Sequence, residues 1–389
     1  MSYRPRPINR KIDLRAISAL ETTNNNVVKM SSNSSIADSD LDFDVDVTPC
    51  ASELLPSKNN LIRGAKYSYS VGRKIMPGRY GAVYEVLRSN DGKPFAAKLE
   101  ICDTGFSGLN YDYKVLKAAE KKGCAEHFAT LIDRGKIEGH FKFLVMPMLG
   151  QNLWQLRHNF EGNRFGAPTA LRLALETLAG IERLHGLGYI HRDIKPSNFL
   201  INPSNNNIVL IDFGICRGYR NANGEPKPPR EDCTFRGTTR YAALAAHENE
   251  EQSPKDDIES WFYLVVEFIV GNLPWAAFRK AERDTVRRLK KYARTTDGFA
   301  ELCKHCPRNE FRRILTYIDS LGYYAHPDYT YLRSVIQLAM KNNGIKGDEP
   351  YDWQQDDTDE GIDTDKIGKV NGKQTMAITN SLNALLLKG

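Results

Sequence analysis

The hydrophobic pattern of this chain changes near Gly150, and that change limits the folds it can adopt. Before Gly150, short β-rich runs are separated by turn signals such as Asn90-Asp-Gly92. A helix-like stretch at residues 109–120 interrupts them. After Gly150, apolar residues recur at helical spacing. We therefore expect an α+β fold with a small β-rich N-lobe and a larger helical C-lobe. The expected strands are residues 67–75, 82–87, 94–100 and 141–146.

Two helices of the second part are the clearest. One opens at Pro168-Thr169 and ends at Gly186 to Gly188. The other, Ile258 to Val270, follows Asp257, stops at Gly271 and is apolar nearly all round. A helix without a polar face belongs in the middle of a domain, because it has no side that favours water.

The chain divides into three predicted segments. Residues 1–66 form a disordered N-terminal arm, because their polar, low-complexity stretches cannot bury a core. Residues 67–353 form the compact domain, with the N-lobe at about 67–148 and the C-lobe at about 149–353. Residues 354–389 form an acidic, mostly disordered tail.

Composition narrows the possible partners. Lys plus Arg total 54 against 48 Asp plus Glu, a net charge of +6. This excess is small for a nucleic-acid binder but compatible with an acidic or phosphorylated partner. No apolar run is long enough to cross a bilayer, and seven scattered cysteines fit reduced thiols. We expect no nucleic-acid or membrane partner and a cytoplasmic or nuclear location, although the Arg-rich start leaves a mitochondrial transit peptide as an alternative.

The segment with the most chemical information is His191-Arg-Asp-Ile-Lys-Pro-Ser-Asn198, which is followed by Asp212-Phe-Gly214. The carboxylate of Asp212 is a hard ligand suited to Mg²⁺ on a triphosphate, and Asn198 supplies a neutral second ligand. Asp193 is placed to accept or orient the proton of an incoming hydroxyl. Both segments, in this order, match the protein-kinase signatures H-R-D-x-x-x-x-N and D-F-G.

Two lysines extend this resemblance. Lys195 lies where Ser/Thr kinases have a lysine that contacts the γ-phosphate, and Phe95-Ala-Ala-Lys98 resembles the V-A-I-K strand. The resemblance implies that Lys98 holds the α- and β-phosphates and pairs with an acid on the next helix. The best match is Asp112, whose side chain is one methylene shorter than the usual glutamate. Either the helix approaches more closely or a water bridges the pair; Glu120 is the alternative partner.

The glycine-rich loop departs from its pattern. Ile75 to Val83 keeps Gly78, Gly81 and the valine of G-x-G-x-x-G-x-V, but a methionine and Pro77 replace the first glycine and its neighbour. The loop normally offers backbone N–H groups to phosphates, and proline removes one donor. We therefore expect weaker or differently shaped nucleotide binding.

From residue 67 to 353 the chain resembles the casein kinase 1 group, and the tau-tubulin kinase branch most closely. The motifs that carry this resemblance are His191–Phe199, Phe235–Ala242, Ala243–Ala245, Asp256–Ser260, Gly271–Trp275 and, for the branch, Lys227–Arg230. The resemblance implies a bilobal kinase fold with ATP and Mg²⁺ in the cleft. It also implies that Asp257 braces the catalytic loop by accepting backbone hydrogen bonds.

The same resemblance implies the nucleotide contacts. Met146 is the expected gatekeeper, and Pro147 to Leu149 is the hinge whose backbone meets adenine. The expected ATP-binding residues are Ile75, Gly78, Gly81, Val83, Ala96, Lys98, Asp112, Met146, Met148, Leu149 and Asp212. Arg230, Arg236 and Arg240 could form a substrate anion site, because guanidinium groups bind carboxylates and phosphates bidentately.

The function expected from these residues is that of a monomeric protein Ser/Thr kinase acting on acidic or pre-phosphorylated proteins, cytoskeletal ones among them. One alternative is a pseudokinase or binding scaffold, which the altered glycine-rich loop and Asp112 would favour. The intact set of Lys98, Asp193, Asn198 and Asp212 argues for activity. A microtubule-associated structural role rests on analogy alone.

Overall fold

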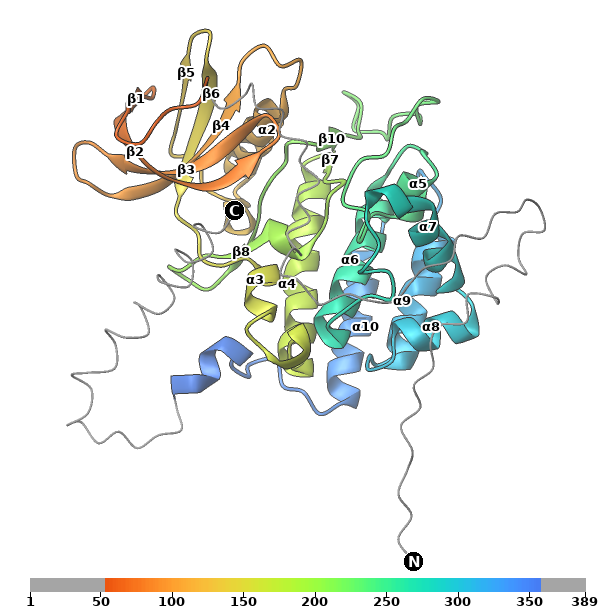
Figure 1. The fold of residues 1–389 in the computed structure, drawn as a ribbon. Helices are drawn as coiled ribbons and strands as arrows, with labels where there is room; N and C mark the ends of the chain where they lie inside the picture. Colours follow the sequence, from red (N-terminus) through yellow and green to blue (C-terminus); the bar gives the residue numbers. More distant parts are fainter. Residues whose placement is uncertain (1–52, 358–389) are drawn as a thin grey trace, which may run out of the picture. The chain divides into compact units, whose positions relative to one another are not determined.

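The computed structural model describes residues 53–357 (Figure 1). The chain divides into two compact units, Met1–Glu349 and Pro350–Gly389. In the described part of the second unit, Asp352–Asp357 form a 3₁₀ helix, and the rings of Tyr351 and Trp353 stack with centroids 4.4 Å apart.

The N-lobe is a six-stranded antiparallel sheet in the order β1-β2-β3-β4-β6-β5. Its strands are β1 Leu61–Arg63, β2 Ser68–Gly78, β3 Gly81–Arg88, β4 Pro94–Ile101, β5 Asp133–Ile137 and β6 Phe141–Pro147. Alternate residues of β3 (Ala82, Tyr84 and Val86) are buried, as expected of a sheet with one face on a core. Core residues of β2, β4 and β6 pack against them.

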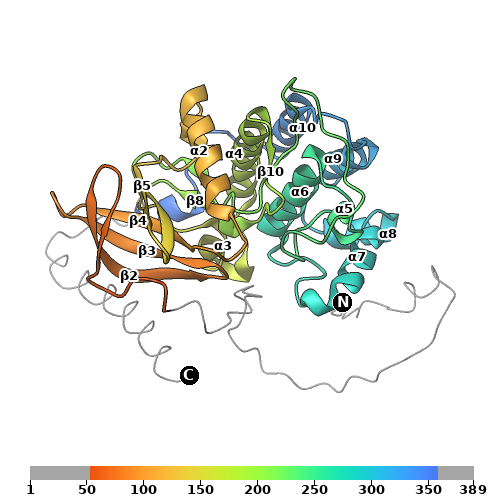
Figure 2. The same cartoon turned by 90° about the horizontal axis from the view of Figure 1, so that it is seen from above.

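Helix α2, Gly108–Lys122, lies against β4 and β6 of this sheet (Figure 2). Its buried residues recur at helical spacing, including Leu109, Asp112, Val115 and Ala119. The helix ends at Gly123, whose left-handed backbone (φ 67°) favours glycine. The burial of a charged residue, Asp112, on this apolar face marks the side of α2 that carries function.

The C-lobe is built around α4, Ala167–Gly186, and α6, Pro254–Val270, which pack against each other. Helix α6 begins with Pro254 at its first position and with a capping box in which Ser253 and Asp256 bond reciprocally. Fifteen of its residues are buried, as its all-round apolar sequence predicted. The other helices are α3 Leu153–Arg157, α5 Leu244–His247, α7 Arg283–Tyr292, α8 Thr296–Leu302, α9 Arg308–Ser320 and α10 Tyr329–Asn342.

Short elements between the lobes position the loops with chemical residues. Two small antiparallel sheets pair β7 with β10 and β8 with β9. These strands are β7 Tyr189–Ile190, β8 Phe199–Ile201, β9 Ile208–Leu210 and β10 Arg217–Gly218. The remaining 3₁₀ turns are η2 Ala125–His127, η3 Glu161–Asn163, η4 Pro196–Asn198 and η5 Lys280–Glu282.

Two strands of the N-lobe sheet were not predicted from the sequence. Strand β1 lies within residues 1–66, which were predicted to be a disordered arm. Its three residues become a strand only through pairing with Ser68–Ser70 of β2. Strand β5 was missed because its sequence, Asp-Arg-Gly-Lys-Ile, has little β propensity and is defined by its partner β6. The first unit ends at Glu349, and the predicted end of the compact domain at residue 353 stays a prediction. Residues 1–52 and 358–389, predicted to be disordered, lie outside the described residues.

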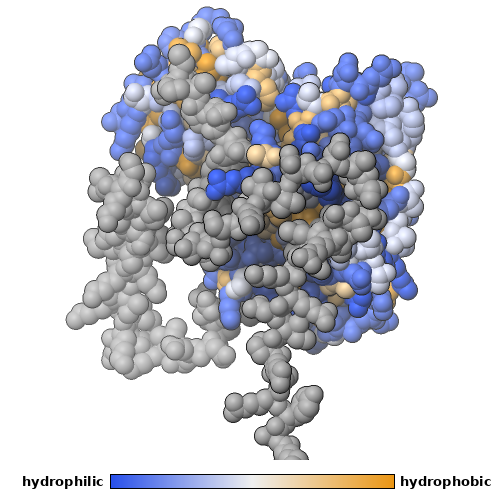
Figure 3. Space-filling model, turned by 45° about the vertical axis from the view of Figure 1, so that its right-hand side comes forward, coloured by the Kyte–Doolittle hydropathy of each residue, from blue (hydrophilic) through white to orange (hydrophobic). Residues whose placement is uncertain are grey.

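The face of the protein drawn in Figure 3 carries mainly hydrophilic side chains, with hydrophobic ones in small scattered groups. No helix within residues 53–357 has both the length and the apolar character needed to cross a membrane.

Candidate active site

Asp257 at the start of α6 holds the loop that follows β7. Its carboxylate accepts hydrogen bonds from the backbone N–H groups of His191 and Arg192, at 2.6 and 2.8 Å, and contacts His185 Nε2 at 2.8 Å. The side chain of Asp257 is buried, and Arg192 has a left-handed backbone (φ 67°). These contacts are the brace that the sequence led us to expect, and they hold an unfavourable backbone conformation next to Asp193.

Asp193 sits in a network of three side chains. The hydroxyl of Thr238 donates to Asp193 Oδ1 at 2.7 Å, and Lys195 Nζ lies 2.9 Å from Oδ2. Lys195 also donates to Thr238 Oγ1 at 3.0 Å. Thr238 was not among the predicted site residues. Its place in the motif Phe235–Ala242 was the one sequence feature that could have pointed to it. The network orients both carboxylate oxygens of Asp193, and its action on a substrate hydroxyl stays a prediction.

Lys98 on β4 is held between two carboxylates. Its Nζ lies 2.7 Å from Asp112 Oδ2 and 2.7 Å from Asp212 Oδ1. Burial by itself lowers the pKa of Lys98, but the two carboxylates outweigh that effect and raise it. The positive charge of Lys98 holds the pKa of Asp212 well below its usual range. One cation facing two anions leaves the cluster with a formal charge of −1, which favours a divalent cation.

Asp112 contacts Lys98 directly, which decides between the alternatives left open by the sequence. The helix approaches closely and no bridging water is needed, while Glu120 pairs with Lys117 on the exposed side of α2. Asp112 Oδ1 also accepts a hydrogen bond from the backbone N–H of Phe213, at 2.8 Å. A single short carboxylate therefore joins α2 to both the lysine and the Asp-Phe-Gly segment.

Asn198 and Asp212 are suited to hold Mg²⁺. Asn198 Nδ2 donates to the backbone oxygen of Asp193, at 2.8 Å, which leaves its amide oxygen available. The Asp212 side chain is about half exposed. Both are hard oxygen ligands, and Mg²⁺ usually takes only one or two protein ligands besides phosphate and water. Residues 53–357 contain no group of three or more His, Cys, Asp or Glu side chains that could hold a metal ion.

The residues predicted to bind ATP come together through strand register. Val83 on β3 pairs with Lys98 on β4, and Ala96 on β4 pairs with Met146 on β6. Met148 and Leu149 follow β6 directly. Their contact with nucleotide stays a prediction.

The glycine-rich segment forms the end of the β2–β3 hairpin. Gly78 pairs with Gly81 across a two-residue turn, and Pro77 pairs with Ala82. The side chain of Ile75, preceding this turn, is 41% exposed. The predicted effect of Pro77 on nucleotide binding stays a prediction.

The three arginines of the predicted anion site have separate surroundings. Arg230 pairs with the buried carboxylate of Glu251, and Arg240 lies 3.4 Å from the buried carboxylate of Glu267. Arg236 is exposed. Each carboxylate is shared with a second arginine, Glu251 with Arg217 and Glu267 with Arg157, and an anion at Arg230 or Arg240 would have to compete with an existing ion pair. The proposed role of these arginines stays a prediction.

Comparison with known proteins agrees with this geometry. Residues 69–316 match the model of the protein kinase domain. The chain therefore belongs to the protein kinase family, whose members use ATP with Mg²⁺ as the usual metal. It is also similar to a probable serine/threonine-protein kinase of Dictyostelium discoideum, with 33% identity over 298 residues. The match covers 76% of this chain and 57% of that relative, so the chain spans little more than half the length of the relative.

Proposed function

We propose that this protein is an active Ser/Thr kinase that transfers the γ-phosphate of ATP to hydroxyl groups of protein substrates. The observation that carries the proposal is the network around Asp193, where Thr238 and Lys195 hold both carboxylate oxygens. In this arrangement Asp193 orients the substrate hydroxyl and takes its proton, while Lys195 and Lys98 compensate negative charge on the phosphates. Bound Mg²⁺ would neutralise charge that develops on the transferred phosphate, with Asn198 and Asp212 as its protein ligands.

The alternative function, a pseudokinase or binding scaffold, has less support than it had from the sequence alone. One of its two grounds was the replacement of the usual glutamate by Asp112. The direct 2.7 Å contact between Asp112 and Lys98 removes that ground. The altered glycine-rich loop is the ground that remains.

A Lys98→Met variant tests the proposed activity. We expect wild type to transfer labelled phosphate from Mg·ATP to casein or tubulin, and the variant to lose about 10²- to 10³-fold in rate, because a positive charge aimed at the phosphates is removed. Lys117→Met is the matched control, since Lys117 is half-exposed on α2 and pairs only with Glu120 among the described residues. Absence of transfer from folded wild type would favour the scaffold.

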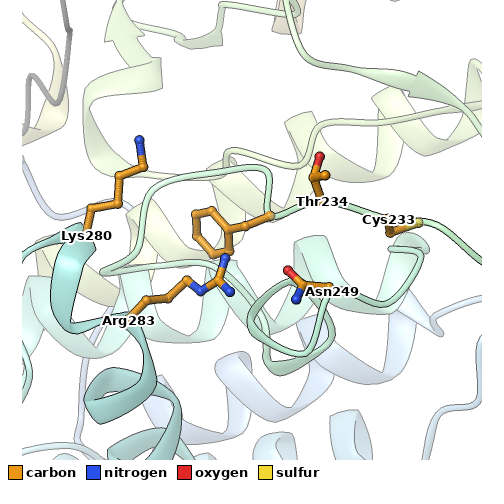
Figure 4. A pocket seen from close by; sticks show the side chains of 6 residues that line it. Cys233, Thr234, Asn249, Lys280 and Arg283 are labelled. Atoms are coloured by element: carbon orange, nitrogen blue, oxygen red, sulfur yellow. The ribbon is translucent and has the colours of Figure 1, made fainter.

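We further propose that the protein belongs to the casein kinase 1 group, in the tau-tubulin branch, and prefers acidic or pre-phosphorylated substrates. A cavity of about 480 Å³ beside residues 233–235 supports this preference. Lys280 and Arg283 lie on one side of it, and Thr234 and Asn249 on the other (Figure 4). Within residues 53–357 neither cation has an acidic partner, and the Arg283 guanidinium lies 4.9 Å from the Phe235 ring centroid. The cavity therefore offers two positive charges without acidic partners next to residues 233–235.

Substitution of the two cavity cations tests the substrate class. We expect Lys280→Ala and Arg283→Ala each to raise KM for a phosphorylated or acidic peptide about 10-fold, through loss of a charge-assisted hydrogen bond. The KM for a neutral peptide should be unchanged. Arg288→Ala is the control, because Arg288 is exposed on α7, the helix that also carries Arg283, but does not line the cavity. Equal effects on acidic and neutral peptides would contradict the preference.

A further inference from the structure

We propose that Glu100 and Lys142 form a brace that, together with the absence of a side chain at Gly108, sets helix α2 at the distance that the short Asp112 side chain requires. This inference rests on the proposed kinase function, because the role of Asp112 is to hold Lys98 and the Asp-Phe-Gly segment. The residues of the brace are positioning residues, which act through Asp112.

The length of Asp112 makes the position of α2 critical. Its two oxygens are both used, Oδ2 toward Lys98 and Oδ1 toward the N–H of Phe213. An aspartate reaches about 1.5 Å less far than a glutamate, the length of one carbon–carbon bond. The helix backbone must therefore lie closer to both partners than a glutamate would need, and something must hold it there.

Gly108 permits this close approach. Gly108 and Asp112 are four residues apart and share one face of α2. A Cβ added at Gly108 would lie 3.1 Å from the Cα of Gly214 and 2.4 Å from a ring carbon of Phe106. The first turn of α2 therefore packs almost backbone to backbone against the Asp-Phe-Gly segment.

Glu100 and Lys142 hold the same turn from the sheet. They are cross-strand partners on β4 and β6, and Lys142 Nζ lies 2.7 Å from Glu100 Oε1. Glu100 Oε2 accepts a hydrogen bond from the N–H of Leu109, at 2.7 Å, and Lys142 Nζ donates to the side chain of Asn110, at 3.2 Å. The buried Glu100 and the partly exposed Lys142 thus each bind one residue of the first turn of α2.

Glu100 also caps the N-terminus of α2. The first N–H groups of a helix have no partner inside it, and the residue before the helix usually supplies one. Here the N-cap residue Ser107 makes no such side-chain bond. The carboxylate of Glu100 does so instead, at the end of the helix where a negative charge is stabilised. The cap therefore comes from strand β4, which also carries Lys98, so one strand positions both the lysine and the helix that contacts it.

A compensation experiment tests the spacing. Phosphate-transfer kinetics and Mg·ATP affinity by calorimetry would be measured for wild type, Gly108→Ala, Asp112→Glu and the double variant. We expect each single change to lower kcat about 10-fold. This is less than the roughly 10²-fold loss in rate that a 1 Å misplacement of reacting groups can cause. The added methyl group pushes α2 outward, and the longer acid is too long for the native spacing. The double variant should recover activity above both singles, because the longer acid then spans the wider gap.

Three outcomes would overturn the proposal. The Asp112→Glu variant could have the kinetics of wild type. The fold-losses in kcat of the two single variants could simply multiply in the double variant, or Gly186→Ala could lower kcat as much as Gly108→Ala does. Gly186 is the control because it is also helical but has open space around its Cβ position. Glu100→Gln should also lower kcat and raise the Kd for Mg·ATP, whereas the exposed Glu120→Gln on the same helix should not.

The two readouts separate this inference from the proposed function. If wild type binds Mg·ATP but transfers no phosphate, the kinase proposal fails, and the Kd values of the same four proteins still test the spacing of α2. The proposed spacing predicts weaker binding in each single variant and recovery in the double, and the brace predicts weaker binding in Glu100→Gln. Equal Kd values in all four proteins would refute the proposed spacing.

Discussion

Asp193→Asn is expected to lower kcat about 10²- to 10⁴-fold, the usual contribution of a positioned general base. Asparagine has nearly the same shape and can still accept the hydrogen bond from Thr238, which is 2.7 Å from Oδ1 in the native protein. It cannot take up a proton from the substrate hydroxyl at neutral pH. The loss should therefore appear in kcat, while the Kd for Mg·ATP changes little, because the substitution leaves Lys98 and Asp212, the proposed phosphate and Mg²⁺ contacts, unchanged.

Steady-state kinetics together with ATP-binding calorimetry would measure both quantities. Asp91→Asn is the matched control, since Asp91 lies in the turn between β3 and β4, far in sequence from Asp193, and pairs with Arg88 at the end of β3. A variant at Asp193 that keeps more than a tenth of wild-type kcat would show that another group takes the proton.

Asp257→Ala should have the largest effect on stability, lowering the free energy of unfolding by about 3–5 kcal/mol. The substitution leaves the backbone N–H groups of His191 and Arg192 and the ring of His185 without their buried acceptor. Urea unfolding followed by circular dichroism would measure the change. Asp284→Ala is the control, because the Asp284 side chain is 78% exposed on α7. A loss below about 1 kcal/mol would contradict the role given to Asp257.

The effect of Asp257 should also depend on pH in a defined direction. Burial by itself raises its pKa, but the hydrogen bond and electrostatic interaction with His185, together with the interactions with His191 and its backbone N–H, outweigh that effect and lower it. A carboxylate with a lowered pKa in the folded state stabilises the protein above its ordinary pKa of about 3.9 and loses that contribution as the pH falls. The stability difference between wild type and Asp257→Ala should therefore be full at neutral pH and shrink in acid.

Much of the fold was predictable because its signals are local. The apolar run from Ile258 to Val270 predicted a buried helix, and the structure has Pro254–Val270 as the central helix of the C-lobe. Strands β2, β3, β4 and β6 were each found within a few residues. The extra strands β1 and β5 could not be predicted, because their short sequences acquire strand geometry only from hydrogen bonds to β2 and β6.

The sequence by itself determined the chemical groups expected at the site, because Lys98, Asp193, Asn198 and Asp212 stand in segments that resemble protein-kinase motifs. Tertiary structure alone decided which groups they contact. The partner of Lys98 was ambiguous between Asp112 and Glu120 until the packing of α2 against β4 placed only the former within 2.7 Å.

Thr238 and the Glu100–Lys142 brace likewise emerged only in three dimensions, because each acts on residues from other elements of the fold. A carboxylate one methylene shorter than usual can serve this site only if backbones approach closely. Such an approach depends on the packing of glycines far apart in the chain, Gly108 and Gly214, which no local pattern records.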